Sequence, residues 1–132
     1  GFNLTPDEER LAIADRLNSR IQIHSHDGHF HASHPMPADS RPCGINFVQW
    51  QGHPYAVVGS LDDPEKEKRP APIYILDGIT YEVISTVRPK EELGVELADH
   101  LHNVIFHIHD GRLFLVCQAW NPGHYFVLEM AG

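Results

Sequence analysis

Residues 11–23 of the chain read LAIADRLNSRIQI, and the dipeptide Asp27-Gly28 follows shortly after. Two apolar runs lie on either side of a polar segment, and polar and apolar side chains alternate from Arg20 to His24. A period of two residues is typical of a β-strand with one buried face. Asp-Gly is a common hairpin turn. The stretch therefore predicts a strand, a polar turn, a second strand and a hairpin.

The same pattern of strands and turns repeats along the rest of the chain. Leu11, Tyr55 and Leu113 each begin an apolar strand after a polar turn, and an inner strand is expected about eleven residues before each of them. Units of about 44 residues with four short antiparallel strands are typical of propeller blades. The sequence thus predicts an all-β propeller of about three four-stranded blades with eleven visible strands. The predicted blades cover roughly residues 1–38, 39–89 and 100–132, and a short helix is expected within 90–101.

Composition restricts the classes of function. The 132 residues carry a formal net charge of −8, which argues against nucleic acid and against anionic membranes as partners. Neither a signal peptide nor an apolar run long enough to span a membrane is visible in the sequence. Cys43 and Cys117 are expected to be free, buried thiols, because two distant cysteines make neither a zinc-finger spacing nor a disulfide framework.

Ala14-Asp15-Arg16 through Gln22, followed by Asp27-Gly28, resembles the NHL repeat. More closely, the chain is similar to the later blades of the peptidyl-α-hydroxyglycine α-amidating lyase family and its bacterial relatives. This resemblance implies half of a six-bladed ring and a zinc-dependent lyase that cleaves a carbinolamide. The specific match lies in residues 14–22, and the second and third units have diverged from the pattern.

The resemblance also implies site residues. His102 matches a family zinc ligand at the start of an inner strand, and Arg16 matches an active-site arginine. Asn103 stands where the family has an acidic residue of a structural calcium site, and its neutral amide makes calcium doubtful. Arg16 would hold a substrate carboxylate or stabilise an oxyanion. The alternatives are an Asp15–Arg16 ion pair that is only structural, and a His102 that is an ordinary channel histidine.

Five other histidines lie close together in the sequence around the Asp27-Gly28 turn. They would take up nickel or copper adventitiously at the surface, since imidazole suits both metals and nothing supplies converging ligands. We expect no dedicated metal site from them. The residues are His24, His26, His29, His31 and His34.

Two functions follow as hypotheses. The first is a lyase-like or hydrolase-like propeller site that works only in a complete ring. The second is a non-catalytic protein-interaction scaffold, because propellers host many unrelated functions. The expected partners are a second copy that completes a six-bladed ring and a small-molecule or peptide ligand. The chain would otherwise be a fragment of a longer propeller.

Overall fold

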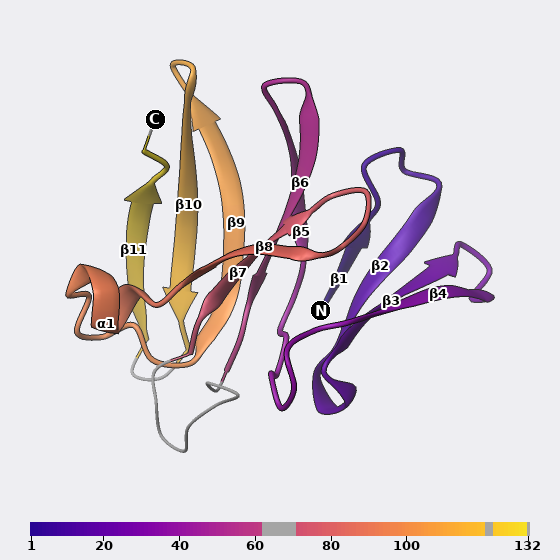
Figure 1. The fold of residues 1–132 in the computed structure, drawn as a ribbon, viewed down its shortest axis with the longest axis horizontal. Helices are drawn as coiled ribbons and strands as arrows, with labels where there is room; N and C mark the ends of the chain where they lie inside the picture. Colours follow the sequence, from indigo (N-terminus) through magenta and orange to yellow (C-terminus); the bar gives the residue numbers. More distant parts are fainter. Residues whose placement is uncertain (62–70, 121–122, 132) are drawn as a thin grey trace.

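The chain folds into three antiparallel sheets, shown in Figure 1 as a computed structural model that describes residues 1–61, 71–120 and 123–131. The first sheet has the order β1-β2-β3-β4, the second β5-β6-β7-β8 and the third β11-β10-β9. The first two sheets comprise β1 (Phe2–Leu4), β2 (Arg10–Asp15), β3 (Arg20–Ser25), β4 (Phe30–Pro35), β5 (Asn46–Trp50), β6 (His53–Gly59), β7 (Ile73–Asp77) and β8 (Val83–Val87). The third comprises β9 (Leu101–His109), β10 (Arg112–Ala119) and β11 (His124–Glu129).

This architecture is the all-β, propeller-like fold that the sequence predicts. Each sheet is an antiparallel meander, and the sheets stand beside one another as in a sector of a propeller (Figure 1). The described residues form eleven strands, the number visible in the sequence and one fewer than three complete four-stranded blades would have. Residues 5–9 form a turn, and β2 begins at Arg10, one residue before the apolar run.

Burial of the strands explains their sequences. The middle sheet is covered on both faces: Ala56 and Val58 belong to the core beneath β1–β4, whereas Val57 and Ile75 belong to the core beneath β9–β11. A strand buried on both sides needs a continuous apolar run, as in residues 55–59 and 73–76. The outer sheets are buried on one face only, and β3 and β10 accordingly alternate.

The inner strands β1, β5 and β9 connect the sheets to one another. Asn3 Nδ2 donates to the Ile45 carbonyl at 3.2 Å, and the Phe106 amide donates to Asn46 Oδ1 at 3.0 Å. Gly59 permits close packing here, because a Cβ on it would lie 2.8 Å from the Leu101 carbonyl oxygen. The approach of Gly59 to Leu101 lies where β9 begins, at the end of the molecule that carries the predicted site.

The predicted helix is shorter than expected. Helix α1 covers only Pro89–Leu93, and Gly94 ends it in a left-handed conformation with a φ of 69°. The Leu93, Leu97 and Leu101 spacing is not a helical face, because Leu101 begins β9 and the other two are exposed. Within the described ranges, no helix has the length and apolar character needed to cross a membrane.

Candidate functional site

Arg16 lies directly after β2, in the short 3-10 helix η1 (Arg16–Asn18). Together with Ser40 and Arg41 it lines a polar pocket of about 150 Å³. Ser40 is fully buried, and its hydroxyl has no hydrogen-bond partner among the described residues. Two guanidinium groups and a hydroxyl beside one small pocket are suited to an oxyanion. The remaining lining residues are Leu17, Ser19 and Asp39.

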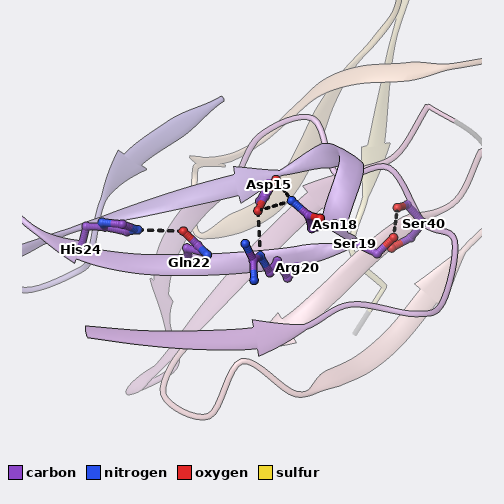
Figure 2. Close-up of polar contacts among 7 residues, drawn as sticks. All are labelled: Asp15, Asn18, Ser19, Arg20, Gln22, His24 and Ser40. Carbon is purple, nitrogen blue, oxygen red and sulfur yellow. Dashed lines mark hydrogen bonds and ion pairs between the residues drawn. The ribbon is translucent and has the colours of Figure 1, made fainter. Parts of the chain in front are cut away.

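The ion pair beside this pocket is not the expected one. Asp15 accepts from Arg20 Nε at 2.7 Å, and Asn18 Nδ2 donates to both of its carboxylate oxygens at 3.0 and 2.9 Å (Figure 2). These hydrogen bonds, that from Arg20 first, hold the pKa of Asp15 below its usual range. The alternative of an Asp15–Arg16 pair is wrong, because Arg20 faces Asp15 across the β2–β3 ladder. Arg16 forms no ion pair with any described residue.

Two further residues continue the row of polar groups along β3. Gln22 contacts His24 Nε2 at 2.8 Å (Figure 2). His24 Nδ1 lies 3.3 Å from the Gly28 carbonyl. A carbonyl can only accept, so in a neutral ring Nδ1 carries the proton and Nε2 accepts from the Gln22 amide nitrogen. The Gln22 oxygen then accepts from Arg20 Nη2 at 2.8 Å. The row is therefore satisfied internally, which suits a structural role.

His102 and Asn103 lie together at the start of β9, where the ladder with β10 is irregular. Asn103 pairs with Gln118 and Leu101 pairs with Ala119, so His102 is an extra residue in a β-bulge. Both His102 and Asn103 are exposed, whereas Leu101 and Val104 on either side are buried. The bulge thus exposes two consecutive polar side chains at the beginning of an inner strand.

The described residues of one chain do not form a zinc site. Catalytic zinc sites use three protein ligands, and no three His, Cys, Asp or Glu side chains converge within the part of the chain that the structure describes. His102 is thus a single candidate ligand. Asn103 offers a neutral amide oxygen, and calcium sites are built mainly from several carboxylate and carbonyl oxygens. Any metal at this position would need ligands from other blades.

The histidines near the Asp27-Gly28 turn do not converge either. His26 Nε2 contacts the Glu8 carbonyl at 2.9 Å, whereas His34 stacks on Tyr81 of the neighbouring sheet with 4.4 Å between ring centroids. Tyr81 and His34 line a second, larger cavity that the sequence pattern did not indicate, because the two residues belong to different units. Periodicity within one unit carries no signal for contacts between two units.

A histidine–aspartate pair was also missed. His53 Nε2 lies 2.7 Å from Asp77 Oδ2, while Asp77 Oδ1 accepts from the Ile79 and Thr80 amides at 2.7 and 2.9 Å. The two amides and His53 lower the pKa of Asp77 to about 2. The Asp-Gly turn was visible in the sequence, but its histidine partner was not.

Comparison with known proteins gives no family. No protein-family model matches the chain, and no curated protein matches it. Among solved structures, the chain is similar to a dihydro-heme d1 dehydrogenase, NirN, in complex with DHE, at 15% identity and a TM-score of 0.37. The match covers 99% of this chain and 38% of that chain, so the present chain spans well under half of the protein that it matches.

Proposed function

We propose that this chain is a sector of an NHL-type propeller, and that a second copy completes a six-bladed ring. Support comes from its two outer sheet faces. The N face is the side of β1–β4 that carries Phe2, Leu4, Leu11 and Ile13, and the C face is the side of β9–β11 that carries Ile105, Phe114, Val116, Tyr125 and Val127. Phe2 is 73% exposed and Tyr125 70% exposed. Contiguous apolar surface of this kind is a feature of interfaces.

A two-fold axis that coincides with the central axis of the ring would bury the N face and the C face of both copies. The C face of each copy would pack on the N face of its partner, so the same contact would form twice. Three sheets from each copy would give the six blades. The Asp15–Arg20–Gln22–His24 row on the N face would be a polar margin beside the apolar contact, as is common at interfaces.

In the completed ring, we propose a lyase-like or hydrolase-like site at the end where the inner strands begin. Arg16 would bind the carboxylate of a small-molecule or peptide ligand, because its guanidinium stays protonated and is planar. Two copies of His102 would face one channel, and zinc would require at least one more ligand than they supply.

The experiment is multi-angle light scattering over a wide concentration range. We expect the mass of two chains. Tyr125→Glu on the C face and Ile13→Glu on the N face should each give a folded monomer, whereas Leu93→Glu, at an exposed position on α1, should leave the dimer intact. A monodisperse wild-type monomer at every concentration would contradict the ring proposal.

Metal analysis of tag-free protein separates the two candidate functions. The enzyme predicts about one zinc per two chains, lost in His102→Ala, and carbinolamide turnover lost in Arg16→Lys. A dimer with neither zinc nor turnover would instead support the second candidate, a non-catalytic interaction scaffold.

A further inference from the structure

A cavity of about 360 Å³ lies between the first and second sheets, at the opposite end from Arg16 and His102. The β7–β8 turn approaches the β1–β2 segment here, as Figure 1 shows. Three parts of the chain line the cavity: the 5–10 turn, the inward face of β3 and β4, and the β7–β8 turn with Pro54. This cavity lies within one chain, so it does not depend on assembly of the ring.

The floor of the cavity is aromatic and uncharged near neutral pH. The rings of His34 and Tyr81 stack with 4.4 Å between centroids and 12° between planes, and Phe47 meets Tyr81 edge-on at 6.1 Å. Burial raises the pKa of Tyr81, and the Asp7 carboxylate adds to this effect. Burial lowers the pKa of His34. Ile23 and Ala32 continue the floor as an apolar surface.

The rim of the cavity carries two opposite charges, Asp7 and Arg10. The buried Thr5 hydroxyl donates to Asp7 Oδ1 at 2.7 Å and accepts from the Arg10 amide at 3.1 Å, so it anchors both residues. The Glu9 amide also donates to Asp7 Oδ1, at 3.1 Å. The hydrogen bond from Thr5, followed by that from Glu9, keeps the pKa of Asp7 below its usual range. The Arg10 guanidinium forms no ion pair within the described residues.

We propose that this cavity binds a small zwitterion, namely a free α-amino acid with an apolar side chain. Its carboxylate would pair with Arg10, its ammonium group with Asp7, and its side chain would lie against Ile23, Ala32 and the aromatic floor. A ligand with a single charge would pair with one of Asp7 and Arg10 and be repelled by the other. A zwitterion can pair with both. The volume is within the usual range for small-ligand sites.

The test is titration of the full chain with leucine, followed by amide NMR shifts and by calorimetry. Isoamylamine has the same apolar body without the carboxylate, and 4-methylpentanoate has it without the ammonium group. We expect leucine to shift the amides of residues 5–10 and 78–81, and each analogue to bind at least about tenfold more weakly. Equal binding of either analogue, or no saturable binding of leucine, would overturn the proposal.

Variants test the assignment of each charge. Arg10→Gln and Asp7→Asn should each weaken leucine binding by about tenfold or more without loss of the folded spectrum. Arg112→Gln is the matched control, because Arg112 is an exposed guanidinium paired with Glu129 on the third sheet. Its leucine affinity should equal that of the wild type. Unchanged leucine affinity in both rim variants would contradict the site. These results do not depend on the ring proposal, because the cavity lies within one chain.

Discussion

Arg20 Nε donates to Asp15 Oδ2 over 2.7 Å, and the two residues face each other across the β2–β3 ladder. Their side chains are 38% and 24% exposed, so water screens the pair in part. We expect a double-mutant cycle with Asp15→Ala and Arg20→Ala to give a coupling free energy of about 0.5–1 kcal/mol in urea unfolding.

The matched cycle pairs Asp15→Ala with Arg16→Ala. Its coupling should be near zero, because Arg16 has left the strand and lines the polar pocket instead. A larger coupling to Arg16 than to Arg20 would show that the register of the β2–β3 hairpin is different in solution.

The close approach of Gly59 to β9 gives a second prediction. A Cβ at this position would lie 2.8 Å from the Leu101 carbonyl oxygen and 3.0 Å from Val104 Cγ2. We expect Gly59→Ala to lower the free energy of unfolding by about 1–3 kcal/mol, since two packed strands must separate. Urea denaturation measures this change directly.

Gly44→Ala is the control for that substitution. No atom lies within 4 Å of the place that a methyl group would occupy on Gly44, and the backbone there is outside the left-handed region. The change should be neutral, or stabilising by up to about 1 kcal/mol through the unfolded chain. Equal losses at both positions would mean that β6 and β9 are not in contact.

Cysteine reactivity gives a third prediction. Cys117 is fully buried, and burial raises the pKa of its thiol to about 12. Because the thiolate is the reactive form, we expect no alkylation of Cys117 by iodoacetamide in the native protein near neutral pH. Mass spectrometry after digestion should show rapid labelling only in urea. Leu17→Cys, at a position 86% exposed, supplies the reactive control. Native labelling of Cys117 at the control's rate would contradict the core beneath β9–β11.

The strands could be predicted well from the sequence because the burial of a strand determines how its apolar and polar residues alternate. Alternation from Arg20 to His24 reflects one buried face, and the continuous run from Tyr55 to Gly59 reflects a sheet covered on both sides. Consecutive strands pair, so their order followed once the hairpin turns were recognised. The helix was overestimated because Leu93, Leu97 and Leu101 have helical spacing, although Gly94 ends the helix.

The site was predicted less well, for a different physical reason. Asp15 is the last residue of β2 and Arg16 begins η1, so Asp15 is matched by its cross-strand neighbour Arg20 rather than by Arg16. The bulge that exposes His102 beside Asn103 depends on the register of β9 with β10. The stack of His34 on Tyr81 joins two sheets. Contacts set by register or between sheets cannot be read from a local pattern.

The hydrogen bonds to the Asp77 carboxylate should stabilise the fold, and this stabilisation should be lost at acidic pH. Its pKa falls from an ordinary 3.8 to about 2, because the Thr80 and Ile79 amides and His53 favour the carboxylate. A depressed folded-state pKa stabilises the fold above the unfolded value and loses this effect as the pH falls through the folded value. We therefore expect the free energy of unfolding of the wild type to decrease between about pH 4 and pH 2 more steeply than that of Asp77→Asn. Asp110→Asn, at the exposed β9–β10 turn, controls for the loss of one carboxylate and should follow the wild-type profile. Parallel profiles for the wild type and Asp77→Asn would show that the hydrogen bonds from the Thr80 and Ile79 amides and His53 to Asp77 do not persist in solution.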